Sequence, residues 1–241
     1  MVSSGYGGDM HYELREDVYW ANMELHSRNL ALYTWGNASG IDRKAGVVAI
    51  KPSGLAYEKL KPELIPLVAL DGKVIDGDLK PSSDTPTHLE LYKAFPGIGG
   101  IVHTHSPHAV AWAQAVCAIP CLGTTHADHF HGAVPVTQPL TDEEVAGDYE
   151  AATGRSIVRA FREAGIDPDA VPAVLCASHD PFAWGPTPEK AVYNAVVLEE
   201  IGPDRVDDEG LVARNRPGIK SIARQTLSAQ TRSQCLLWSR R

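Results

Sequence analysis

Short β-branched runs alternate along the chain with segments that begin at clear helix-capping residues, and this order constrains the fold most. Asp84-Thr85-Pro86 and Thr187-Pro188 each place a capping residue ahead of a proline at the start of a helix. The pattern predicts helices over residues 12–29, 84–95, 141–164 and 187–201, and strands over residues 47–50, 67–70, 74–75, 101–105 and 173–177. The regular βαβ rhythm of a parallel sheet is absent, so we expect several antiparallel neighbours.

Composition places the chain among ordinary globular proteins and excludes several classes of partner. Of its 241 residues, 44% are hydrophobic and 22% are charged. The length suits one large domain, and no linker is evident before residue 202. The net charge of -8 argues against nucleic-acid and anionic-membrane partners, because phosphate-binding surfaces normally carry a basic excess.

The expected lack of a membrane span and of a secretory signal favours the cytoplasm, and so does the cysteine usage. No apolar run approaches the ~18 residues that a membrane span needs, and we expect no secretory signal at the N-terminus. The four cysteines are few, unevenly spaced and outside CxxC pairs, which favours reduced thiols: Cys117, Cys121, Cys176 and Cys235.

Ten histidines offer candidate metal ligands. His103 and His105 are two residues apart on a predicted strand, so both side chains should point to one face and form half of a transition-metal site. His179 follows the strand over residues 173–177 and is a candidate third ligand, which would leave an open position for substrate. An isolated histidine pair also occurs in structural roles. By spacing alone, a second and denser group is an equally good candidate for metal binding: His126, His129 and His131. The isolated histidines are expected to be structural or exposed: His11, His26, His88 and His108.

Two loops carry donors that suit a phosphate despite the acidic net charge. One is Lys51-Pro52-Ser53-Gly54, and the other, Pro81-Ser82-Ser83-Asp84, precedes a predicted helix whose first N–H groups favour anions. Neither loop is a P-loop. Simple helix capping also explains the second loop, and the residues alone favour capping.

Six segments, in this order, resemble the class II sugar-phosphate aldolase/epimerase family. They are TWGNAS (34–39), IKPSG (50–54), KPSSDTPTH (80–88), GGIVHTHSPHA (99–109), GTTHAD (123–128) and SHDPFAWG (178–185). The match extends over residues 14–201, and within the family it is similar to epimerases that act at C4 of L-ribulose 5-phosphate. The resemblance implies a three-layer α/β/α fold around a mostly antiparallel sheet, assembled as a homotetramer.

The same resemblance implies the site residues. His103, His105 and His179 would hold a divalent metal, normally Zn²⁺ although another divalent ion is an alternative, with Asp84 close to it. The dense group of three histidines drops out as ligands. Two glycines, four polar residues and one lysine would surround the phosphate of a small ketopentose phosphate: Gly36, Asn37, Lys51, Ser53, Gly54, Ser82 and Ser83. Asp128 would be one acid/base residue, and a tyrosine near the C-terminus of a neighbouring subunit would be the other.

The implied reaction interconverts L-ribulose 5-phosphate and D-xylulose 5-phosphate, as in L-arabinose catabolism. The hydrogen on C4 is not acidic, so inversion there calls for retro-aldol cleavage of C3–C4 and re-addition, with a Lewis acid and two proton-transfer groups. A class II aldolase that cleaves a deoxyketose 1-phosphate is the alternative. Such aldolases generally carry Glu where this chain has Asp84, which favours an epimerase.

Residues 202–241 depart from the family pattern and form an atypical tail after the domain over residues 1–201. The family's C-terminal segment supplies the tyrosine, whereas no Tyr follows Tyr193 in this chain. Synonymous codons for QTRSQCLLWS (230–239), read one base later, encode KHGRNAYYG, which resembles the family's ending. We therefore hypothesise a frameshift near Gly202, which resequencing the coding DNA would test; a genuinely divergent tail is the competing interpretation. Without the tyrosine, a metal-binding but weakly active remnant is a further alternative.

Overall fold

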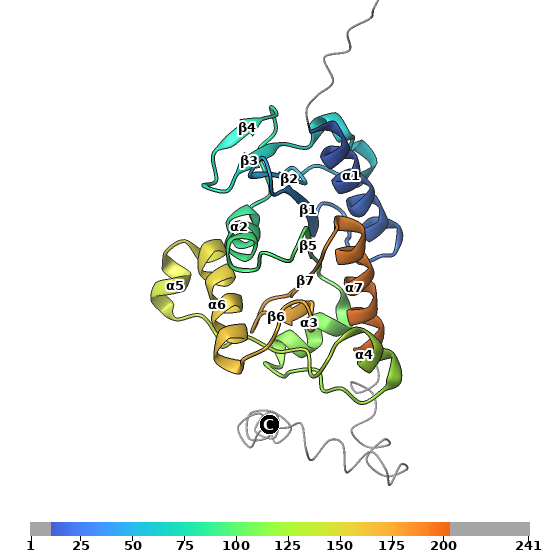
Figure 1. Cartoon of the computed structure of the whole chain (residues 1–241), viewed down its shortest axis with the longest axis vertical. Coiled ribbons are helices and arrows are strands. Elements are labelled where there is room, and N and C mark those ends of the chain that lie inside the picture. Colours follow the sequence, from blue (N-terminus) through green and yellow to red (C-terminus); the bar gives the residue numbers. More distant parts are fainter. Residues whose placement is uncertain (1–10, 203–241) are drawn as a thin grey trace, which may run out of the picture.

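The computed structural model describes residues 11–202 (Figure 1). Its helices are α1 (Tyr12–Ser27), α2 (Thr85–Ala94), α3 (Pro107–Gln114), α4 (Thr124–His129), α5 (Asp142–Ala146), α6 (Tyr149–Ala164) and α7 (Pro188–Ile201), with 3₁₀ turns η1 (Tyr57–Lys59) and η2 (Pro62–Leu64). Its strands are β1 (Asn37–Asp42), β2 (Val47–Ile50), β3 (Leu67–Ala69), β4 (Val74–Asp76), β5 (Gly100–His103), β6 (Ala173–Leu175) and β7 (Pro181–Gly185).

All these strands join one sheet in the order β4-β3-β2-β1-β5-β7-β6. Every neighbouring pair is antiparallel, which confirms the predicted sheet type. The central strand β1 pairs with β2 on one side and with β5 on the other, and Asn37 stands opposite His103. This register brings the end of β5 to the start of β1, where several of the predicted site residues lie.

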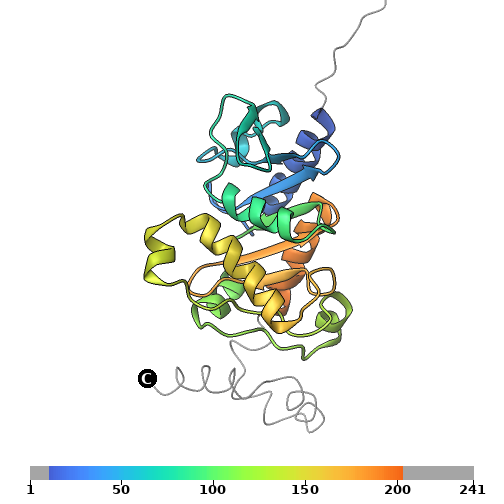
Figure 2. The same ribbon diagram turned by 60° about the vertical axis from the view of Figure 1, so that its left-hand side comes forward.

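Helices cover both faces of the sheet, which confirms the predicted three layers. Helices α1 and α7 lie against one face, whereas α2 and α6 pack together on the other (Figures 1 and 2). Ser39 of β1 ties the sheet to α2, because its Oγ lies 2.7 Å from His88 Nδ1 and 2.8 Å from Tyr92 Oη. In the core, the ring of Trp184 packs against that of Phe161, with centroids 5.2 Å apart.

Two glycines let the start of α7 lie directly on the sheet. A Cβ atom on Gly100 would be 2.4 Å from Pro188 Cα, and one on Gly40 would be 2.8 Å from Pro188 Cγ. Real Cβ atoms do not approach so closely, so larger residues here would push helix and sheet apart. These glycines therefore set the spacing between the layers.

Three local predictions differ from the structure. The helix predicted over residues 141–164 is two helices, because the chain breaks at Gly147 and restarts at Asp148, whose carboxylate caps α6 by accepting from Ala151 N–H. Strand β5 ends at His103, so His105 lies in the segment that follows. The elements β1, β7, α3 and α4 were not predicted.

The structure bears on the predictions about cysteines and about membrane spans. Cys121 and Cys176 are free thiols, as predicted. In residues 11–202, no helix has both the length and the apolar character for a membrane span. Cys235 and the tail from residue 203 lie outside the described residues.

Candidate functional site

Backbone hydrogen bonds bring the two candidate phosphate loops side by side. The Ser53 N–H donates to the carbonyl of Lys80 at 2.8 Å, and the Ser82 N–H donates to the carbonyl of Lys51 at 3.0 Å. The hydroxyl groups of the two loops, together with Gly54 and Ser83, therefore lie at one place on the molecule. We call this place the polar corner; it comprises residues 51–54 and 80–84.

Asn37 links the polar corner to the centre of the sheet. Its Nδ2 donates to Asp84 Oδ2 at 2.7 Å, while its buried Oδ1 has no hydrogen-bond partner among the described residues. The Asp84 side chain makes no capping bond to α2, so simple capping does not explain its position. The neighbouring Gly36 has φ +68°, and a Cβ there would lie 3.0 Å from the carbonyl oxygen of His103. Glycine thus lets the turn before β1 approach the end of β5.

Lys51 is the cation of the polar corner. It is only 1% exposed, and burial lowers its pKa to about 8. Its Nζ donates to the carbonyl of Thr34 at 3.2 Å and lies 4.7 Å from the ring centroid of Tyr57. Within residues 11–202 no carboxylate pairs with it. The ammonium is therefore mostly charged at neutral pH and is available to a bound anion.

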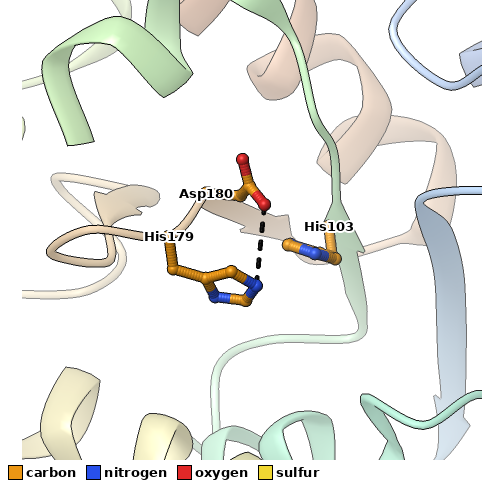
Figure 3. A group of neighbouring side chains, drawn as sticks. All are labelled: His103, His179 and Asp180. Atoms are coloured by element: carbon orange, nitrogen blue, oxygen red, sulfur yellow. Dashed lines mark ion pairs between the residues drawn. The ribbon is translucent and has the colours of Figure 1, made fainter. Parts of the chain in front are cut away.

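His103 and His179 converge with Asp180 beside the end of β5, as Figure 3 shows. One potential ligand atom from each lies within 4.8 Å of the other two. His103 Nδ1 lies 3.1 Å from the carbonyl of Pro181, which can only accept, so Nδ1 carries the hydrogen and Nε2 keeps its lone pair. His179 Nδ1 is buried without a hydrogen-bond partner among the described residues. Two available imidazoles and a carboxylate form a donor set that fits a divalent metal ion.

Electrostatics at His103 favour a ligand rather than a cation. Burial lowers its pKa, and the neighbouring imidazoles of His179 and His105 lower it further, against the opposing effect of Asp84. A neutral imidazole is the form that binds metals. Burial also acts to raise the pKa of Asp84, but the imidazoles of His103 and His88 and the amide of Asn37 outweigh it, so this pKa is lowered. Asp84 is therefore a carboxylate close to the histidines.

His105 stands at the edge of this group. Its ring centroid is 5.0 Å from that of His103, and its Nδ1 is 3.2 Å from Asp180 Oδ2. The structure thus gathers His103 and His179, places His105 and Asp84 next to them, and adds Asp180.

The structure does not bring Asp128 to the histidines of its own chain. Asp128 is exposed on α4 and lines a separate cavity of about 450 Å³ together with Gly97 and Gly185. Gly185 pairs with Gly100 at the end of β5 and β7 opposite to His103, and Gly97 precedes β5 in the chain. Three residues of strand, roughly 10 Å, separate the two ends.

The denser histidine group does not converge on a metal site. His126 Nε2 lies 2.7 Å from the carbonyl of Gly132, and His129 Nε2 lies 2.7 Å from Tyr193 Oη. In the described part of the chain, the one group of three metal-binding side chains that comes together is the one around His103. His88 is fully buried, and burial lowers its pKa to about 3.

Sequence reasoning missed three side chains around the histidines. Asp180 directly follows His179, so a carboxylate beside a candidate ligand was visible in the sequence. The ring of Trp35, within TWGNAS, lies 5.7 Å from that of His105. The ring of Tyr149 lies 5.8 Å from that of His179. Tyr149 comes from α6, and no sequence signal pointed to it.

Comparisons with known proteins identify the family of the chain. The family model of the class II aldolase and adducin N-terminal domain matches residues 16–202. The L-ribulose-5-phosphate 4-epimerase UlaF of Salmonella paratyphi C is 52% identical over 189 residues, which cover 78% of this chain and 82% of that protein.

Solved structures show the same fold. An L-fuculose 1-phosphate aldolase superposes with a TM-score of 0.66 at 21% identity, over 88% of this chain and 95% of that chain. The L-fuculose-1-phosphate aldolase of Thermus thermophilus superposes with a TM-score of 0.61 at 28% identity, over 79% of this chain and 91% of that chain. Family model, relatives and fold agree, and the chain belongs to the class II aldolase family.

Proposed function

We propose that the chain is a divalent-metal-dependent epimerase that interconverts L-ribulose 5-phosphate and D-xylulose 5-phosphate. The observation that carries the proposal is the position of Asn37, which is opposite His103 in the sheet and hydrogen-bonded to Asp84. Through it the polar corner adjoins the histidine group. One small phosphorylated ketopentose would fit across both, and the activity in the name of the 52% identical relative supports this substrate.

The reaction has to break a carbon–carbon bond, because the C4 hydrogen is not adjacent to the carbonyl. Cleavage of C3–C4 gives an enediolate and glycolaldehyde phosphate, and re-addition to the other face of the aldehyde inverts C4. When bound at the histidine group, a divalent ion, zinc in this proposal, supplies Lewis-acid stabilisation of negative charge on substrate oxygens. Lys51 and the hydroxyl and N–H groups of the polar corner hold the phosphate, so the aldehyde can turn without escaping.

Asp128 is the proposed acid/base residue for the C4 hydroxyl proton. Because it lies at the opposite end of the strands from His103, we propose that it serves the site of a neighbouring copy in a homotetramer. Its exposed position on α4 supports this arrangement. The proposed location of the enzyme is the cytoplasm, because a phosphorylated sugar is charged and does not cross membranes unaided.

The test of function is an assay of the full chain, loaded with Zn²⁺, on L-ribulose 5-phosphate in D₂O. We expect D-xylulose 5-phosphate that retains its C4 hydrogen, with little free aldehyde. Deuterium at C4 would contradict carbon–carbon cleavage, because it requires proton abstraction at that carbon. Aldehyde release in excess of epimer would favour the aldolase alternative. No turnover of the sugar phosphate would refute the proposal.

A mixing experiment tests the role of Asp128. Chains with His103→Ala and chains with Asp128→Asn are expected to be nearly inactive alone. Co-expressed, they should form mixed tetramers in which some sites keep both intact groups, so activity should exceed the sum of the two variants. Mixed assemblies without recovered activity would exclude a shared site.

A second candidate function is a metal- and sugar-phosphate-binding remnant with weak epimerisation. The observation that favours it is the lack of any tyrosine after Tyr193. Normal zinc content together with strongly reduced epimer formation would support this alternative, whereas turnover equal to that of the UlaF relative would exclude it.

A further inference from the structure

We propose that Asp180 is itself a ligand of the divalent metal, beside His103 and His179, which gives the site a carboxylate in addition to Asp84. The sequence-based ligand set contained Asp84 and three histidines but not Asp180. This inference rests on the proposed function only in that both place a metal at this group.

The first argument is distance. Asp180 Oδ2 lies 3.6 Å from His179 Nε2 and 3.2 Å from His105 Nδ1. Two ligand atoms that are each about 2.1 Å from a tetrahedral ion lie about 3.4 Å apart. The carboxylate oxygen is thus spaced from its imidazole neighbours as one ligand is from another, and Figure 3 shows it directed toward His179 and His103.

The second argument is charge. Asp180 is only 7% exposed, and in residues 11–202 its ion pairs are with histidines, with no lysine or arginine among them. A buried carboxylate is strongly disfavoured unless a positive charge compensates it. Asp84 is a second carboxylate near His103. Two carboxylates would balance the charge of one divalent ion.

The third argument is rigidity, because the turn that carries Asp180 is held by its backbone. The N–H of Cys176 donates to the carbonyl of Asp180 at 3.2 Å, and the N–H of His179 donates to that of Cys176 at 3.0 Å. The Ser178 N–H donates to the carbonyl of Ala113 in α3 at 3.0 Å. Ser178 also adopts φ +59°, an uncommon conformation for a non-glycine residue that needs such support. The turn therefore presets the carboxylate beside the imidazoles, as a ligand requires.

A carboxylate ligand has a consequence for metal choice. It adds an anionic oxygen to the imidazole nitrogens and lowers the net charge at the ion. Oxygen ligands suit Mn²⁺ better than an all-imidazole site does. Loss of Asp180 should therefore weaken the binding of Mn²⁺ more than that of Zn²⁺.

The test uses the full chain with Asp180→Asn, which keeps the shape of the side chain and removes its charge. Affinities for Zn²⁺, Mn²⁺ and Co²⁺ are measured by competition with a coloured chelator, and the visible absorption of bound Co²⁺ reports its ligands. His103→Ala serves as the variant that loses the site. Glu199→Gln is the matched control, because Glu199 is another buried carboxylate paired with an imidazole, that of His108 at 2.8 Å. Thermal melts with chelator confirm folding.

We expect Asp180→Asn to weaken binding at least ~10-fold and to change the Co²⁺ spectrum, with Glu199→Gln unaltered in both. Weaker binding with an unchanged spectrum would mean that Asp180 only positions a histidine, and would overturn the proposal. Unchanged or tighter binding would also overturn it, while a loss of binding in His103→Ala would leave the metal site standing. If the unmodified chain binds none of the three ions, the metal site and the proposed function fail together.

Discussion

Replacing Lys51 by methionine should make the protein more stable at neutral pH while it weakens phosphate binding. Lys51 is almost fully buried at the polar corner, and burial holds its pKa at about 8 instead of the ordinary 10.5. The folded protein therefore tolerates an ammonium that it disfavours. We propose a functional reason, because a bound phosphate would offset the free energy that burial of the ammonium costs.

The magnitude follows from the pKa. The difference between 10.5 and about 8 corresponds to roughly 3 kcal/mol, which solvent screening reduces to about 2 kcal/mol. The methionine also removes the hydrogen bond to Thr34, worth about 1 kcal/mol. Its thioether keeps contact with the Tyr57 ring and offsets the lost cation–π contact. The net expected gain is about 1 kcal/mol.

The gain should depend on pH in a defined direction. Below pH 8 the lysine is protonated in both the folded and the unfolded state, so the unmodified protein bears the full penalty. Between pH 8 and 10.5 the folded state loses its proton first, and the stability of the unmodified protein rises with pH. The advantage of Lys51→Met should therefore vanish above about pH 10.5.

Urea unfolding at pH 7 and at pH 10.5 measures this difference, with the exposed Lys59→Met as the matched control. Inorganic phosphate should raise the unfolding midpoint of the unmodified protein but not that of Lys51→Met. A loss of stability at pH 7, or an advantage that persists at pH 10.5, would refute the reasoning about buried charge.

Two further predictions concern packing and positioning. Gly100→Ala should lower the free energy of unfolding by roughly 1–3 kcal/mol, because its Cβ would lie 2.4 Å from Pro188 Cα; an unchanged denaturation midpoint would contradict this. His126→Ala should lower kcat without changing zinc content, because the contact of its Nε2 with the carbonyl of Gly132 holds the helix that carries Asp128. Equal kcat values, with zinc measured in both proteins, would exclude this positioning role.

Elements specified by local interactions were predictable from the sequence. Helices α2 and α7 start as expected, because each has a proline in its first turn. At α7 the Thr187 side chain also caps the helix by accepting from Lys190 N–H. Strand β1 was missed, since NASGID lacks a β-branched run and is held as a strand by its neighbours β2 and β5. The break at Gly147 was missed because the capping box at Thr141 suggested one long helix, whereas it starts only the short α5.

The ingredients of the site were also readable from the sequence, since motifs such as SHDPFAWG and IKPSG are short and contiguous. The arrangement of these motifs in space could not be predicted from the sequence. The joining of the two loops, the position of Asn37 opposite His103 and the entry of Asp180 into the histidine group all depend on contacts between distant segments.

The sequence by itself therefore determined the family, the helices with local start signals and the residue types available for metal and phosphate. The tertiary structure alone decided which of those residues meet. It placed Asp180 beside His103 and His179, and it left Asp128 at the other end of the strands. The physical reason is range: caps and turns act over a few residues, whereas strand register and helix packing bring together residues that no local pattern relates.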